Sequence, residues 1–166
     1  MLPQPATVRQ PSDITFTCKD LSAIDIGVGI DTSRYGHYAA FLDDKLQQAA
    51  AELEVAESAR GYAGLRQRFV DLVHKHGRAR FFVRLDVAGA YADNLLAWLQ
   101  TLTIDRADFS ISCGDPQRNK NYRAAVFGSK KSDPIEARAC ARYALSERPQ
   151  PMPIGSDFVE PKMAAR

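Results

Sequence analysis

Apolar and polar residues alternate along residues 24–30, the first regular pattern in the chain. This period of two predicts a β-strand with one apolar face, made of Ile24, Ile26, Val28 and Ile30. Its other face carries two glycines, Gly27 and Gly29, so we expect a second backbone or a ligand to approach that face closely.

Four more segments have the composition of strands. Residues 38–42 predict a second strand, and the polar residues 43–45 after it favour a turn. Residues 47–55 predict a third strand that forms a hairpin with the second, although the alanine-rich run 48–53 is equally compatible with a helix. The remaining strands are predicted at residues 81–86 and 109–113.

Four further segments are expected to be helical, three from the spacing of their apolar residues and one, residues 115–125, as a polar helix. The clearest helix has Ser58 as its N-cap and stops at Gly77, as capping preferences predict. The four helices are expected at residues 58–76, 88–102, 115–125 and 134–145. Three consecutive strands followed by alternating helices and strands predict an α/β fold, in which a three-strand meander and βαβ units form a mixed sheet with helices on both faces. This is the element order of a ribonuclease-H-like (RuvC-like) fold.

The 166 residues suffice for one domain, and their apolar (45%) and charged (25%) fractions are typical of a globular protein. We expect a leader at residues 1–22, a domain at 23–147 and a proline-rich tail or linker at 148–166. No apolar run approaches the ~20 residues of a membrane span, and the N-terminus lacks an apolar signal core. Three widely spaced cysteines without a CxxC pair favour a reducing, cytoplasmic location.

The net charge of +2 does not indicate a nucleic-acid-binding protein, but the charge is unevenly distributed. Residues 118–142 contain seven basic residues and two acidic ones. This segment is either a solvated basic face or a surface that contacts phosphates. The candidates for nucleic-acid contact within it are Lys120, Arg123, Lys130, Lys131 and Arg138.

Two carboxylates follow apolar strands. Asp31 ends the first predicted strand, and Asp86 ends the predicted strand at residues 81–86. The carboxyl ends of parallel strands meet at one edge of an α/β sheet, where ligands bind, and carboxylates are the ligands that Mg²⁺ prefers. In the alternative interpretation Asp31 only starts a turn, and Asp86 is a turn residue or N-cap before the next helix.

Asp133 and Glu136 lie three residues apart at the start of the last predicted helix, so both project from one face. Two carboxylates on one face can share a metal ion. Asp-Pro-Ile-Glu is also a good capping arrangement with Asp133 as the N-cap, and sequence chemistry alone favours that interpretation. Four clustered carboxylates can hold two metal ions ~4 Å apart, an arrangement that supports phosphodiester transfer.

Three short motifs together resemble a known family. Gly29-Ile30-Asp31-Thr32-Ser33, the run from Asp86 to Tyr91 (DVAGAY) and the run from Lys131 to Arg138 (KSDPIEAR) are similar to the motifs of the N-terminal domain of DEDD-type insertion-sequence transposases, family one-ten, which are related to the Piv-type invertases. The similarity spans residues 23–145. Asp86 stands where that family has Glu, and Glu136 where it has Asp, so each carboxylate is displaced by about one methylene.

The resemblance implies a RuvC-like fold and DNA strand cleavage and exchange during transposition. It also implies a catalytic, metal-binding tetrad for Mg²⁺, with Mn²⁺ as a substitute, formed by Asp31, Asp86, Asp133 and Glu136. The implied partners are DNA, a structured guide RNA and further copies of the full-length protein, in a bacterial cytoplasm at the nucleoid and without a membrane.

Family members continue into a second domain that carries a serine nucleophile. The resemblance therefore implies that this chain is a catalytic-domain fragment that does not recombine DNA alone. Two alternatives stay open, a stand-alone RuvC-like endonuclease and a non-catalytic nucleic-acid-binding remnant.

Overall fold

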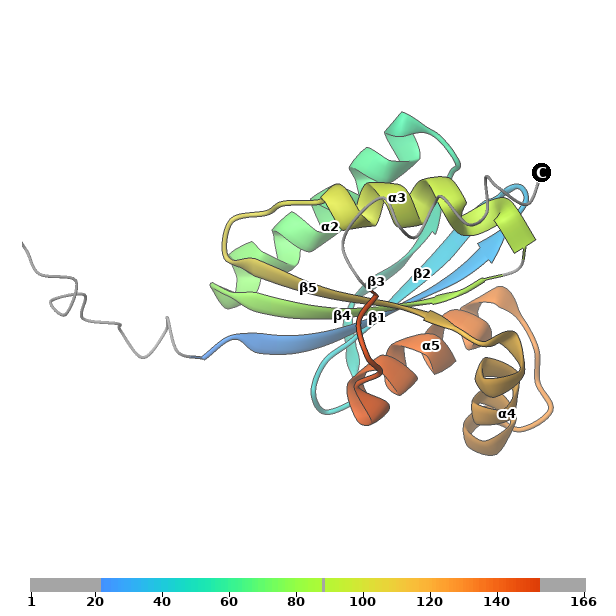
Figure 1. Cartoon of the computed structure of the whole chain (residues 1–166). Coiled ribbons are helices and arrows are strands. Elements are labelled where there is room, and N and C mark those ends of the chain that lie inside the picture. The colour runs from blue at the N-terminus through green and yellow to red at the C-terminus, as the bar shows by residue number, and fades with distance from the viewer. Residues whose placement is uncertain (1–21, 88, 153–166) are drawn as a thin grey trace, which may run out of the picture.

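The computed structural model describes residues 22–87 and 89–152, so the predicted leader (except Ser22) and most of the predicted tail lie outside the described residues. Its elements, drawn in Figure 1, follow one another in this order: β1 (Ile24–Ser33), β2 (Gly36–Leu42), β3 (Gln48–Val55), α2 (Ala59–His76), β4 (Ala79–Asp86), the 3₁₀ helix η2 (Gly89–Ala92), α3 (Asp93–Thr101), β5 (Ala107–Gly114), α4 (Pro116–Phe127) and α5 (Asp133–Glu147).

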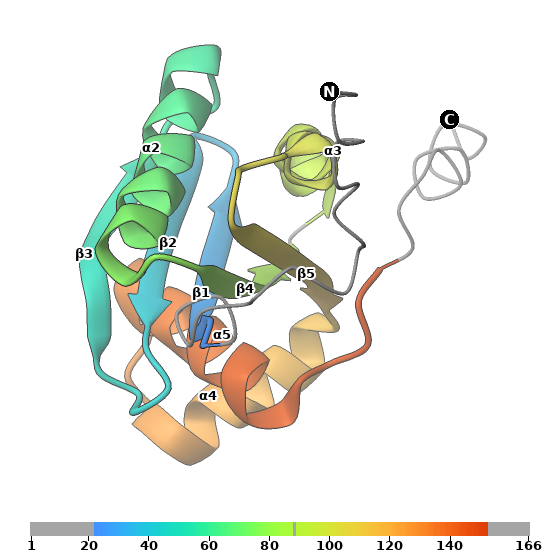
Figure 2. The same ribbon diagram turned by 90° about the vertical axis from the view of Figure 1, so that its left-hand side faces the viewer.

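The five strands form one mixed sheet in the order β3-β2-β1-β4-β5. The meander β1-β2-β3 is antiparallel, whereas β4 and β5 join β1 in parallel. Helices α2 and α3 cover one face of the sheet, and α4 and α5 lie against the other (Figure 2). The predicted α/β architecture, with a mixed sheet and helices on both faces, is confirmed.

The two faces of β1 are buried in different ways. Its apolar residues Ile26, Val28 and Ile30 are fully buried in the core beneath α2, where Phe69 packs edge-on against Phe81. On the opposite face there is no room for a side chain at Gly29, because a Cβ there would lie 1.8 Å from the backbone oxygen of Ala137 in α5. The second backbone expected on the glycine face is therefore α5.

The structure confirms one uncertain local prediction and corrects two others. The segment 47–55 contains a strand, and β1 runs past Asp31 to Ser33 before a two-residue turn. The helix expected from residue 88 begins as the 3₁₀ turn η2, and α3 starts only at Asp93. Gly89 has a left-handed φ of +64°, which an α-helix does not accept, so the regular helix starts after it.

The N-cap predicted for the last helix is wrong by one residue. Ser132 caps α5, since its hydroxyl accepts a hydrogen bond from the Ile135 amide at 3.4 Å, and Asp133 is the first helical residue. The Asp133 carboxylate is therefore not used as the cap. No helix in the described part of the chain is both long and apolar enough to cross a membrane.

Candidate active site

Asp31 and Asp86 are direct neighbours across two parallel strands. They occupy the same register position in the pairing of β1 with β4, near the carboxyl ends of both strands. Thr32 connects the ends of β1 and β4, because its hydroxyl donates a hydrogen bond to the Asp86 carbonyl oxygen at 2.5 Å. The sequence predicted that the ends of these two strands lie side by side, and the structure confirms this.

Helix α5 brings the other two carboxylates to the same edge. Its backbone lies directly on β1, since the missing side chain of Gly29 leaves room for the Ala137 carbonyl. The first turn of α5 therefore lies beside Asp31, and it carries Asp133 and Glu136. Asp133 is exposed, whereas Glu136 is buried.

All four carboxylates line one pocket of about 810 Å³. Three cationic side chains line the same pocket, Lys120 and Arg123 from α4 and Lys131 from the loop before α5. Three segments far apart in the sequence thus supply anionic oxygens to one place: the ends of β1 and β4 and the start of α5.

The electrostatics of the pocket show excess negative charge around Asp31. Burial, followed by the charges of Asp133 and Asp86, raises the pKa of Asp31 to about 7, and a hydrogen bond with Asp133 adds to the shift. Burial also raises the pKa of Glu136, and Arg123 opposes this shift. Functional sites commonly hold carboxylates in such an unfavourable state.

Comparison with known proteins assigns the chain to a family. A family profile described as a transposase, of the DEDD type found in insertion sequences of family IS110, matches residues 28–160. The chain belongs to this family of DEDD transposases. No curated protein matches it.

The family assignment gives the transposase domain a DNA substrate, and DEDD transposases generally use a divalent metal ion. The pocket fits a hard cation in its donor chemistry, because four of its lining residues are carboxylates and the charge around Asp31 is incompletely neutralised. Among the described residues, however, no three His, Cys, Asp or Glu side chains already stand as ligands around one point.

Glu136 is one reason for the lack of a ready-made ligand set in the transposase domain. Its Oε1 lies 2.8 Å from Nε of Arg123, an ion pair whose N–H direction misses hydrogen-bond alignment. Arg123 is itself buried, and its Nη1 donates a hydrogen bond to the Lys130 carbonyl oxygen at 2.8 Å. Glu136 therefore has a counter-ion within the protein, whereas Asp31 forms no ion pair with any residue in the described ranges.

Sequence reasoning missed a polar chain that supports Asp86. Arg84, buried two residues earlier in β4, donates from Nε to Asn119 Oδ1 at 3.0 Å, and Asn119 Nδ2 donates to Asp86 Oδ1 at 3.3 Å. Gly114 makes space for this contact, because a Cβ there would lie 2.0 Å from Asn119 Nδ2. The Arg84 guanidinium also lies over the Tyr143 ring, 3.9 Å from its centroid. The sequence did offer one signal for this network, an arginine within the apolar run of residues 81–86.

The five basic candidates of the transposase domain fall into two groups. Lys120 and Lys131 line the pocket, and Lys130 is exposed beside it. Arg123 is paired with Glu136, and Arg138 donates a hydrogen bond to Glu52 on β3. The three lysines are thus accessible to a phosphate, whereas a phosphate would have to displace a carboxylate from either arginine.

Proposed function

We propose that the pocket is the metal-dependent catalytic centre of this transposase domain. Asp31, Asp86, Asp133 and Glu136 are its ligands, Mg²⁺ is the cofactor and Mn²⁺ can replace it. One observation carries the proposal: Asp31 and Asp86 are register partners on parallel strands, and Asp133 lies against Asp31 in the same pocket.

Each carboxylate has a distinct part in this proposal. Asp31 and Asp86 stand on rigid, hydrogen-bonded strands and form the fixed half of the ligand set. Asp133 and Glu136 stand on the first turn of α5, and Glu136 must leave Arg123 before it can take a metal. The bound metal would polarise the phosphate of a DNA strand that is to be cleaved and exchanged.

The lysines supply the DNA-binding side of the proposal. Lys120, Lys130 and Lys131 lie at or beside the pocket, where they can hold the phosphates that flank the reacting one. The same cationic edge offers phosphate contacts to a structured guide RNA. Arg123 and Arg138 join these contacts only if they exchange their present carboxylate partners.

The test compares DNA binding by the wild-type chain and the Asp86→Asn variant, each with Mg²⁺ and with a chelator. We expect Mg²⁺ to strengthen binding of the wild type at least severalfold, because it neutralises the carboxylates that repel phosphate. Asp86→Asn should remove most of this metal dependence. Equal stimulation of both proteins by Mg²⁺ would contradict the proposed centre.

The Glu136–Arg123 ion pair favours a second candidate, a non-catalytic nucleic-acid-binding domain, because it already neutralises one of the four carboxylates. Incubation with branched and linear DNA and Mn²⁺ separates the activities. Cleavage that Asp31→Asn abolishes would indicate a nuclease that acts without a further domain. Metal-independent binding without cleavage would favour the second candidate.

A further inference from the structure

The turn between β1 and β2 carries an aromatic side chain that the fold does not explain. The turn consists of Arg34 and Tyr35, neither of which has a positive φ, and the residue with a positive φ in this hairpin is Gly36 (+141°). Tyr35 is 87% exposed, the most exposed large apolar side chain in the described part of the molecule. Its aromatic ring gains no packing within the fold and is therefore available to stack on a ligand.

Tyr35 is also oriented by its neighbour. The Arg34 guanidinium carbon lies 5.6 Å from the centroid of the Tyr35 ring, within the range of a cation–π contact. The pair thus presents a flat aromatic surface and a positive charge together at the tip of the hairpin. Aromatic rings bind nucleobases by stacking, and arginine contributes to such contacts.

A groove of about 350 Å³ runs from this tip to the carboxylates. Tyr35 and Tyr38 line it together with Glu54 of β3. Its lining also includes Asp31 and Asp133, which line the larger carboxylate pocket as well. The two hollows therefore meet at these two carboxylates, one on the hairpin side and one on the α4 side.

The two hollows differ in charge. The α4 side has Lys120, Arg123 and Lys131 in its lining, which suits phosphates. Among the described residues that line the hairpin side there is no Lys or Arg, and Glu54 adds a negative charge. That side therefore suits an uncharged base and its sugar, because phosphate would be repelled there.

We propose that the hairpin groove binds one unpaired nucleotide of the DNA strand, with its base stacked on Tyr35, next to the phosphate that lies at Asp31 and Asp133. The base must be unpaired because the face of a base is hidden inside a duplex stack. This inference rests on the proposed function, since it places the reacting strand across the same carboxylates. It adds a preference for single-stranded or frayed DNA.

The experiment measures binding of a labelled single-stranded oligonucleotide by fluorescence anisotropy, with the full 166-residue chain. Each protein is titrated once with Ca²⁺, which like Mg²⁺ binds carboxylate oxygens, and once with a chelator. We expect Tyr35→Ala to weaken binding about tenfold in both arms, as loss of one stacked base predicts. Tyr35→Phe and Tyr35→Trp keep an aromatic face and should bind within about twofold of the wild type.

Salt dependence provides the matched control. Lys131→Ala removes a phosphate contact, so it should lower the slope of log affinity against log salt by about one. Tyr35→Ala should leave that slope unchanged, because stacking releases no counterions. If Tyr35→Ala lowers the slope, or binds as tightly as the wild type, the inference is wrong.

A base analogue reports stacking directly. We expect 2-aminopurine at one position of the oligonucleotide to be quenched by the wild type and the Phe variant, and not by Tyr35→Ala. Absence of quenching at every position, or absence of single-strand binding in both arms, would overturn the inference. A wild-type affinity that is the same with Ca²⁺ and with chelator would contradict the proposed metal centre and not the stacking on Tyr35. The two failures are therefore distinguishable.

Discussion

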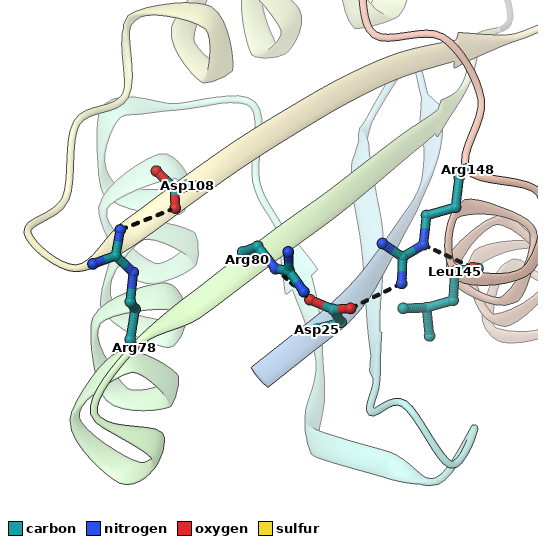
Figure 3. A network of polar contacts seen from close by, with 6 residues as sticks. All are labelled: Asp25, Arg78, Arg80, Asp108, Leu145 and Arg148. Atoms are coloured by element: carbon teal, nitrogen blue, oxygen red, sulfur yellow. Dashed lines mark hydrogen bonds and ion pairs between the residues drawn. The ribbon is translucent and has the colours of Figure 1, made fainter. Parts of the chain in front are cut away.

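Strand β1 carries two aspartates on the same face, six residues apart, in opposite electrostatic settings. Asp25 receives Arg80 Nε at 2.6 Å and Arg148 Nη2 at 2.8 Å (Figure 3). Asp31 is partly buried instead, and burial together with the charges of Asp133, Asp86 and Glu136 raises its pKa to about 7. The protein neutralises the charge at one end of the strand and concentrates like charges at the other.

We interpret the Asp25 end of β1 as structural and the Asp31 end as the proposed functional site. Arg148 also donates a hydrogen bond to the Leu145 carbonyl oxygen and lies over the Phe82 ring, so the Asp25 end holds the C-terminus of α5 on the sheet. Among the residues that the structure describes, no arginine or lysine forms an ion pair with Asp31, as the proposed metal-binding role of this carboxylate predicts. One helix, α5, connects both ends.

The largest effect is expected from a substitution that displaces α5 from β1 and so disturbs both the Asp25 end and the Asp31 end. Gly29→Ala places a methyl group 1.8 Å from the Ala137 backbone oxygen, so α5 must move away from β1. We expect the free energy of unfolding to fall by about 3 kcal/mol or more. The control is Gly64→Ala in α2, where nothing lies within 4 Å and Ala should stabilise the helix by up to about 1 kcal/mol. Urea unfolding measures both, and equal values would contradict the close packing.

The second prediction concerns the Asp31 end alone. Asn119→Ala removes the amide that donates to Asp86, so we expect metal affinity to fall about tenfold or more. Asn121→Ala is the matched control, because Asn121 lies on the same helix and accepts a hydrogen bond from Gln117 of that helix rather than contacting Asp86. Calorimetric Mn²⁺ titration distinguishes them. Similar affinities for the two variants would show that Asn119 does not position Asp86.

The third prediction concerns the Asp25 end. Asp25→Asn weakens two partly exposed ion pairs, and we expect a loss of about 1 kcal/mol in the free energy of unfolding. Asp108→Asn serves as the control, since Asp108 has a single exposed partner, Arg78, at 3.5 Å. That change should fall within the error of a denaturant titration. An Asp25 variant as stable as the control would remove the structural role from this end.

The smallest effect is a pH dependence at Asp31. Because its pKa is raised to about 7 from 3.8, the folded state binds a proton more readily than the unfolded state between these values. Stability from this group is therefore greatest at low pH and is lost as the pH rises toward 7. With a chelator present, Asp31→Asn should be more stable than the wild type at pH 8, by roughly 1 kcal/mol.

This advantage of Asp31→Asn should shrink as the pH falls from 8 to 5, since the wild-type carboxyl then becomes protonated. Thermal unfolding across that range measures it. A difference between the two proteins that does not change with pH would show that Asp31 does not titrate as described.

Local patterns predicted much of the fold. Alternation in β1 and the end signals Ser58 and Gly77 of α2 were enough, because they depend on neighbours in the sequence. The alanine-rich β3 was ambiguous, since its strand form depends on pairing with β2, which periodicity does not report. Ser132 was overlooked as a cap because Asp133 suits that position equally well.

In the candidate site, too, some contacts could be predicted from the sequence and others depend on tertiary packing. The meeting of Asp31 and Asp86 followed from the parallel order of their strands, which the element sequence indicated. The contacts of Asn119 with Arg84 and Asp86 span more than thirty residues and depend on how α4 packs, so no local pattern could give them. The pairing of Arg123 with Glu136 depends on the same packing.

Calorimetric titration of Mg²⁺ and Mn²⁺ into the wild type, Asp25→Asn and Asp31→Asn tests the central claim most directly. The wild type and Asp25→Asn should bind metal with the same affinity, because Asp25 is neutralised by two arginines and none of these three residues lines the pocket. Asp31→Asn should show no measurable binding. Metal binding by Asp31→Asn equal to that of the wild type, or no binding by any of the three proteins, would contradict the account.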